Sequence, residues 1–246
     1  DFDCLVVKPL SATVNEVEHL IELKNSKNKL GLVEFHKRWD RCNLKIKDLI
    51  QNDKIGNPVY SVVEYSQRIS IPTVSFKDWV KGTNIFQYLG VHYVDMIYFC
   101  TGFRPTRTMA VGQKTVLHKK GINTYDSIQA VTEWLDKKTG NTFTSVIITN
   151  WIDPNTSSSM SDQKIKFIGS KGRIESNQKN RGLEVTTKSN NLESINPYFS
   201  DYFLDFYNDN YIFEGYGKDS ISSFVEDVSM LKLNDAKFRP IGDYRP

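Results

Sequence analysis

The sequence is short of the residues that cross-link small folds or hold structural metals. It has three cysteines in 246 residues, Cys4, Cys42 and Cys100, an odd number at wide spacing. A disulfide frame would need an even set, and no cysteine pair or H-E-x-x-H segment predicts a zinc site. We therefore expect reduced, mostly buried thiols in a cytoplasmic protein.

An excess of charge of one sign and long apolar runs are also missing. The 32 basic and 29 acidic residues leave a net charge of +3 and are dispersed, so nucleic-acid binding gains no electrostatic support. No apolar run approaches the roughly 18–20 residues of a membrane span. These absences argue against nucleic-acid and membrane partners, and the chain is long enough to bury a core.

The first 38 residues have the pattern of a β-α-β crossover. Residues 2–7 are apolar without alternation, which is typical of a strand buried on both faces of a parallel sheet. Thr13 and Glu16 form a capping box that opens a helix. Its apolar positions, expected to pack inward, are Val14, Val17, Leu20 and Ile21. A second apolar strand follows at 30–35, and strand, helix and strand imply a parallel sheet.

Two strands and one helix cannot form an α/β domain alone. We therefore expect residues 1–38 to be the end of a larger parallel-sheet domain, whose first part lies outside this sequence.

Residues 39–246 change to a different pattern. Residues 42–51 predict a helix, and from Pro58 apolar residues alternate with a period of two, which predicts strands. Further strand-like runs are 107–117, 127–135, 142–151, 164–168, 172–175 and 183–186, and 219–221 opens a last helix. The predicted fold class is α/β plus α+β, a parallel sheet followed by a mainly antiparallel open sheet of about five or six strands packed on helices.

The segment 82–102 suggests a chemical role. Read as one helix, it buries a stripe of apolar residues, namely Ile85, Leu89, Met96, Ile97 and Cys100. Tyr88, His92 and Asp95 are spaced i, i+4, i+7 and share another face. A carboxylate one turn from a histidine can orient the imidazole for general acid or base catalysis. An ordinary polar contact between the two side chains is the alternative.

A second cluster of candidates follows the two predicted parallel strands. Ligand sites in such sheets lie outside the carboxyl ends of the strands. Lys8-Pro9 comes directly after the first strand, and His36-Lys37-Arg38 after the second.

Four segments, in order along the chain, resemble one family. Val7-Lys8-Pro9-Leu10 with Thr13-x-x-Glu16 resembles the Glu-Lys-Pro-Leu segment and helix of the glucose–fructose oxidoreductase / inositol dehydrogenase / MocA (Gfo/Idh/MocA) family. Residues 35–40 look like that family's next strand end. Residues 90–95 are similar to its Gly-x-His-x-x-Asp helix, and 167–174 to the glycine turn of its sheet.

The resemblance implies an NAD(P)-dependent oxidoreductase that acts on a sugar, nucleotide sugar or polyol. Residues 1–38 would be the C-terminal part of the NAD(P)-binding Rossmann domain, and 39–246 a substrate-binding and oligomerisation domain truncated at its C-terminus. No G-x-G-x-x-G occurs, so the phosphate-binding turn is expected in about 90–100 residues before Asp1. We expect this fragment alone to be inactive, and the protein to form a homo-oligomer through the open sheet.

The resemblance also implies residue roles. Lys8 would lie near the nicotinamide and the reacting hydroxyl, with Pro9 beside it in the cofactor site, and His92 would take the hydroxyl proton. Arg38, Tyr88 and Asp95 are the candidates for contacts with the substrate. The alternatives are a solvated lysine, a hydrogen-bonded structural histidine and an exposed arginine.

Two positions depart from the family pattern. Val7 stands where the family often has Glu, and Tyr88 where it often has Asp. Without these carboxylates, Asp95 becomes the candidate for orienting His92. The second hypothesis is therefore a catalytically degenerate member that acts as a binding or assembly protein. A third, a metal hydrolase using His36, His92 and Asp95, has no motif to support it.

Overall fold

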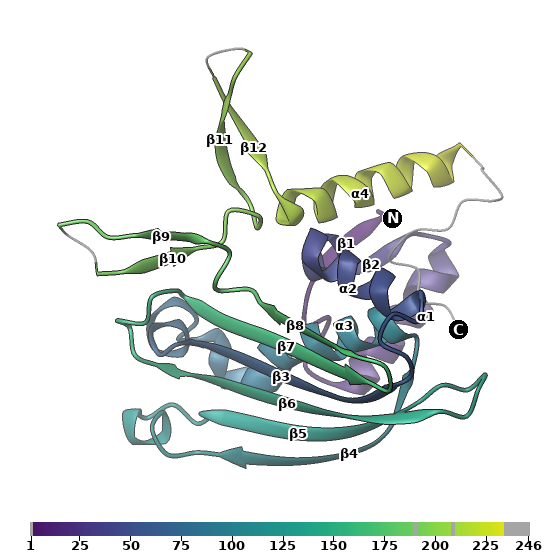
Figure 1. Ribbon diagram of the computed structural model, residues 1–246, viewed down its shortest axis with the longest axis horizontal. Coiled ribbons are helices and arrows are strands. Elements are labelled where there is room, and N and C mark those ends of the chain that lie inside the picture. Colours follow the sequence, from purple (N-terminus) through teal and green to yellow (C-terminus); the bar gives the residue numbers. More distant parts are fainter. Residues whose placement is uncertain (1, 189–190, 208–209, 234–246) are drawn as a thin grey trace. The chain divides into compact units, whose positions relative to one another are not determined.

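The computed structural model describes residues 2–188, 191–207 and 210–233 (Figure 1). The chain forms two compact units and crosses between them twice. The first unit is drawn from residues 1–40 and 198–246, and the second from residues 41–197. One boundary was predicted, near residue 38, and the crossing near residue 197 has no counterpart in that prediction. The predicted truncation after Arg245-Pro246 lies outside the described residues.

The first unit begins with the predicted β-α-β crossover. Strand β1 (Cys4–Val7), helix α1 (Val14–Lys27) and strand β2 (Gly31–Glu34) follow one another, and the two strands pair in parallel. The capping box is also confirmed, because Thr13 Oγ1 accepts the Glu16 N–H and the Glu16 carboxylate accepts the Thr13 N–H. A 3₁₀ helix, η1 (His36–Trp39), follows β2.

The predicted burial of this crossover is wrong. No residue of α1 is buried, and Val6 and Val7 of β1 are exposed. Cys4 is exposed as well, whereas Cys100 is buried as predicted. Apolar side chains of β1, α1 and β2 instead line an open groove of about 510 Å³. Sequence periodicity identifies an apolar face, but it does not say what covers that face.

The rest of the first unit comes from the end of the chain, where the sequence predicts one helix and no strands. Strands β11 (Asp201–Asp205) and β12 (Asn210–Glu214) form a hairpin. Helix α4 (Tyr216–Lys232) follows it and contacts η1 and β2. The first unit is therefore closed by residues about 200 positions after its first strand.

The second unit is built on a six-stranded sheet with the order β4-β5-β6-β3-β7-β8 (Figure 1). Its strands are β3 (Pro58–Arg68), β4 (Arg104–Gln113), β5 (Ser127–Leu135), β6 (Thr142–Asp153), β7 (Ser161–Gly169) and β8 (Arg173–Asn177). All neighbours are antiparallel except β3 and β6. A small ribbon of β9 (Leu183–Val185) and β10 (Glu193–Ile195) follows. The predicted mainly antiparallel sheet is confirmed.

The helices of this unit are α2 (Arg41–Gln51), α3 (Val91–Thr101) and the short turns η2 (Ile71–Ser75), η3 (Trp79–Gly82), η4 (Phe86–Gly90) and η5 (His118–Lys120). The core joins Met96 and Ile97 of α3 to inward residues of the strands, such as Ile147 and Phe167. No helix in the described ranges is long and apolar enough to cross a membrane.

The helix predicted at 82–102 is present but begins at Ile85 instead of Gly82. Its predicted apolar stripe is buried, as expected, at Ile85, Leu89, Met96, Ile97 and Cys100. Asn84 Oδ1 accepts the N–H groups of Phe86 and Gln87, both at 3.0 Å, and so caps a helix that starts after it. The first turn is the π-helix η4, and α3 continues from Val91. A Cβ on Gly90 would lie 2.7 Å from the Phe86 ring, so this turn requires glycine.

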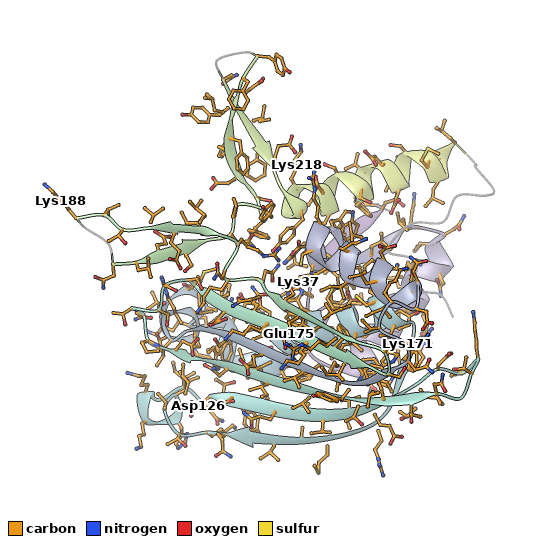
Figure 2. All side chains as sticks on the ribbon, viewed as in Figure 1. Lys37, Asp126, Lys171, Glu175, Lys188 and Lys218 are labelled. Carbon is orange, nitrogen blue, oxygen red and sulfur yellow. The ribbon has the colours of Figure 1, made fainter. Side chains whose placement is uncertain are left out.

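Asp126, labelled in Figure 2, organises the connection between β4 and β5. Its buried carboxylate accepts the N–H groups of Thr115, Val116 and Leu117 at 2.6, 2.7 and 2.8 Å. These contacts turn the chain after Gln113, which is why the strand predicted to reach residue 117 ends early.

We expect Asp126→Ala to lower the free energy of unfolding by about 3 kcal/mol, because three hydrogen bonds to a charged acceptor are lost and donors stay buried. Urea denaturation measures the loss. The matched control is Asp136→Ala, which removes an exposed turn carboxylate that accepts from Lys138 and Thr139. Its effect should be much smaller, and equal losses in the two variants would contradict the assignment.

Candidate functional site

Lys8 lies directly after the carboxyl end of β1 and is 9% exposed, which does not fit the solvated alternative. Pro9 follows it and is half-buried. Burial lowers the pKa of Lys8 to about 8, and the negative charge of Glu34 acts in the opposite direction. A lysine with this pKa is a cation at neutral pH and can lose its proton slightly above it.

Glu34, the last residue of β2, is the carboxylate whose charge acts on Lys8. Its Oε1 accepts a hydrogen bond from Ser220 Oγ at 2.6 Å, and its Oε2 lies 3.0 Å from His36 Nδ1. Burial raises the pKa of Glu34, but the hydrogen bonds with His36 and Ser220 and the positive charge of Lys8 oppose it, and the net pKa is lowered. Glu34 is therefore an anion at neutral pH.

His36 is held between aromatic rings. Its ring stacks on Tyr216 with centroids 5.8 Å apart and meets the edge of Phe199 at 5.4 Å. Burial lowers the pKa of His36, and the hydrogen bond to Glu34 only partly opposes this. A neutral imidazole next to a carboxylate donates its Nδ1–H, so His36 acts as a donor to Glu34.

Sequence reasoning missed Glu34, Ser220 and Tyr216 as parts of this site. Glu34 had a visible signal, because it is a carboxylate in an apolar strand next to a strand end. Ser220 had none, since it lies 186 positions from Glu34 along the chain.

Arg38 is buried, so the alternative of an exposed arginine is wrong. It is 2% exposed, and its guanidinium carbon lies 5.6 Å from the centre of the Phe35 ring. Lys37, labelled in Figure 2, and Asp40 are each 1% exposed. Several buried charged residues therefore follow the carboxyl end of β2, which is the end of a parallel strand where ligands bind.

His92 is buried on α3 in the second unit, with its ring centre 6.3 Å from that of Tyr65. Asp95 follows within one turn and is half-buried. A π-helical turn, η4, leads directly into this histidine. Such turns are frequent at functional sites, and they change the angular step on which an i, i+4 argument depends.

Tyr88 lies in that π-helical turn among aromatic rings. The centres of Phe76 and Trp79 are each 5.4 Å from its own, and that of Trp151 is 6.2 Å away. Burial raises the pKa of Tyr88, and a hydrogen bond from Gln67 partly opposes this. Tyr88 is thus a neutral phenol that can donate or accept a hydrogen bond but does not act as a base.

The predicted site residues fall into two groups. Lys8, Pro9 and Arg38 belong to the first unit, and Tyr88, His92 and Asp95 to the second. Within the ranges that the structure describes, no three His, Cys, Asp or Glu side chains form a group that could hold a metal ion. The hydrolase hypothesis therefore gains no metal site from these residues.

The family model for the GFO/IDH/MocA C-terminal domain matches residues 43–175, more than half of the 246 residues. The chain belongs to the Gfo/Idh/MocA family. The matched range covers α2 from Asn43, α3 and the six-stranded sheet up to Glu175 of β8, and so includes Tyr88, His92 and Asp95.

A curated Gfo/Idh/MocA relative, myo-inositol 2-dehydrogenase of Thermotoga maritima, is 26% identical over 230 residues. The match covers 90% of this chain and 60% of the relative, so the chain spans about three fifths of that protein's length. The similarity therefore extends beyond the C-terminal domain, into the β-α-β crossover or the end of the chain.

Solved structures support the same fold class. A probable dehydrogenase from Thermotoga maritima is 22% identical, with a TM-score of 0.67 over 93% of this chain and 63% of that one. A scyllo-inositol dehydrogenase from Lactobacillus casei, with bound NAD(H) and scyllo-inositol, is 15% identical, with a TM-score of 0.64 over 94% and 64%. The predicted fold class, the end of a Rossmann-like parallel sheet followed by a mainly antiparallel sheet on helices, is confirmed.

The departure at Val7 from the Gfo/Idh/MocA pattern has a structural counterpart. Val7 pairs in register with Glu34 across the β1–β2 ladder. A carboxylate missing before Lys8 in the sequence is thus present one strand away, next to the same lysine.

Proposed function

We propose that the full-length protein is an NAD(P)-dependent oxidoreductase that transfers a hydride between a nicotinamide cofactor and a hydroxyl or carbonyl group of a sugar, nucleotide sugar or polyol. Inositols are the first substrates to test, since two of the proteins named above are inositol dehydrogenases. The observation that carries the proposal is Lys8, a buried cation opposed by an ionised Glu34 at the end of a parallel strand.

The domain assignment is part of this proposal. Residues 1–38 would be the C-terminal part of the NAD(P)-binding Rossmann domain, and 39–246 the substrate-binding and oligomerisation domain. The open groove along β1, α1 and β2 supports the first part, because a face lined by Leu20, Leu30 and Leu32 is suited to further layers of a larger sheet domain.

The residues of this chain fit one end of the cofactor. Lys8 and Pro9 lie at a strand end, where open parallel sheets bind ligands, and Lys8 is buried enough to act on a reacting group. A glycine-rich turn for the pyrophosphate does not occur in the 246 residues, so we assign only contacts near the nicotinamide to Lys8 and Pro9.

In the proposed reaction, the hydride and the hydroxyl proton of the alcohol go to different acceptors. When bound, the nicotinamide ring supplies the carbon that accepts the hydride from the alcohol. The ammonium of Lys8 donates a hydrogen bond to the hydroxyl oxygen and stabilises the negative charge that develops on it. The imidazole of His92 takes the hydroxyl proton, and Asp95 orients the ring.

Substrate contacts are proposed for two further residues. Tyr88 is a buried neutral phenol and can exchange a hydrogen bond with a sugar oxygen. Arg38 provides donors at the end of β2. Tyr88 packs among aromatic rings at a position where the family often has a carboxylate, and this favours the second hypothesis, a degenerate binding or assembly protein.

We also propose that the protein forms a homo-oligomer through its open sheet. Met109, Val111 and Val131 are exposed on the neighbouring strands β4 and β5, where Met109 pairs directly with Val131. Such apolar residues on the outer face of a sheet are suited to contact with a second copy.

The test is an assay of the full-length protein with NAD or NADP and a panel of inositols and sugars. The absorbance of the reduced nicotinamide measures turnover. We expect turnover with at least one polyol. Absence of both turnover and cofactor binding would favour the degenerate hypothesis. The isolated 246 residues are the control and should bind dinucleotide poorly, whereas micromolar binding by them would contradict the domain assignment.

A further inference from the structure

Four polar side chains of the first unit form a buried cluster around one carboxylate. Lys8, Glu34 and Ser220 are each less than 10% exposed, and His36 is half-buried beside them. Lys8 directly follows β1, and the others come from β2, α4 and η1, so four separate parts of the chain converge on this point. The proposed reaction uses Lys8 and leaves the other three without a role.

We propose that Glu34 is the positioning residue for Lys8, with His36 and Ser220 fixing its carboxylate so that the lysine ammonium is held in place and kept charged. This inference rests on the proposed function, in which Lys8 works as a cation.

The backbone places Glu34 next to the lysine. Glu34 pairs with Val7, the residue before Lys8, across the β1–β2 ladder, and parallel strands lie about 4.8 Å apart. Electrostatic interaction between Lys8 and Glu34 acts on both groups, because it raises the pKa of the lysine and lowers that of the carboxyl. Glu34 thus opposes the desolvation of Lys8.

The carboxylate itself is fixed on both oxygens. Oε1 accepts from the Ser220 hydroxyl at 2.6 Å, and Oε2 accepts from His36 Nδ1 at 3.0 Å. The imidazole cannot turn easily, because it is packed against Tyr216 and Phe199. A carboxylate that is held in one orientation can hold the flexible lysine side chain in one position.

Other charged residues lie on the elements that form this cluster. On η1, Lys37 and Arg38 are buried cations, and the charge of Lys37 lowers the pKa of His36. On α4, Asp227 lines the same small cavity as Glu34 and Arg38, but burial and then Glu226 raise the pKa of Asp227, which weakens it as a counter-charge. Asp40, after η1, is the remaining buried acid of this strand end. Glu34 is therefore the charged group that acts on Lys8.

The experiment compares wild type with Glu34→Gln in the full-length protein. The pKa of Lys8 is read from the pH dependence of its acetylation by acetic anhydride, followed by peptide mass spectrometry. We expect a value about 1 pH unit lower or more in the variant, because an opposite charge at this range is lost. The high-pH limb of kcat/KM, which lies at about pH 8 in wild type on this assignment, should move down by the same amount.

Two further variants complete the test. Glu34→Asp keeps the charge and should restore most of the shift, even though its shorter side chain weakens the contacts with Ser220 and His36. Glu22→Gln removes an exposed carboxylate of α1 and should change neither titration.

The possible outcomes separate this inference from the proposed function. An unshifted Lys8 titration in an active Glu34→Gln enzyme would overturn the role of Glu34 alone. A uniform fall in kcat/KM with an unmoved limb would show a merely structural role and also overturn it. Absence of turnover by the wild-type protein, with cofactor and the whole substrate panel, would overturn the proposed function instead.

Discussion

Replacing Lys8 by methionine is expected to lower kcat/KM of the full-length enzyme about 10²–10³-fold, because removal of one preorganised donor to a developing oxyanion has an effect of this size. Methionine keeps the length and the apolar stem of the side chain and removes only the charge and the donors. The residual activity should also lose the high-pH limb near pH 8 that the titration of Lys8 produces. Steady-state kinetics across pH measure both effects.

Two comparisons make this result specific. Lys27→Met removes an exposed cation at the end of α1 and should leave kcat/KM unchanged. Lys8→Arg should not restore activity, since a planar guanidinium does not reproduce the compact ammonium. Full activity of Lys8→Met would refute the assignment of Lys8 and remove the main support for an oxidoreductase.

Replacing His92 by asparagine is expected to lower kcat about 10²–10⁴-fold, the usual contribution of a general base. Asparagine is smaller than histidine but retains a hydrogen-bonding side chain on α3, so the sheet and its helices should persist. The loss should be smaller at high pH, where hydroxide can take the proton. If His92 instead has only a structural role, the variant will unfold at lower urea concentration while its pH profile keeps the wild-type form.

The matched control for His92 is His118→Asn. His118 lies in η5 of the same unit and is exposed, so its replacement removes a histidine without touching the core. We expect unchanged kcat, KM and stability. Comparable losses in the two histidine variants would mean that the effect at His92 is not specific.

The elements that could be predicted from the sequence are those fixed by local signals. The capping box of Thr13 and Glu16 starts α1 because both hydrogen bonds are made within four residues. The strands β5 and β6 follow a period of two, joined by a turn in which Gly140 has a positive φ of 77°. Each of these features depends on neighbouring residues alone.

The structure differs from the prediction where the deciding interactions are distant in sequence, and at one helix cap. The sequence predicts a helix from Gly82, whereas the Asn84 side chain caps a helix that starts after it. The exposure of α1 could not be predicted, because an amphipathic pattern gives no information about the partner. The burial of Arg38 could not be predicted either, since α4 packs against η1 from far along the chain.

The hydrogen bond between Ser220 and Glu34 has a consequence for how the protein comes to be made. A ribosome delivers β2 long before it delivers α4, and the entire second unit emerges between them. Closing a loop of 186 residues is slow compared with forming the local β-α-β crossover. The cluster around Lys8 is therefore among the last parts of the chain to reach its final arrangement. In a nascent chain released before α4, the Glu34 carboxylate would lack its hydrogen bond from Ser220.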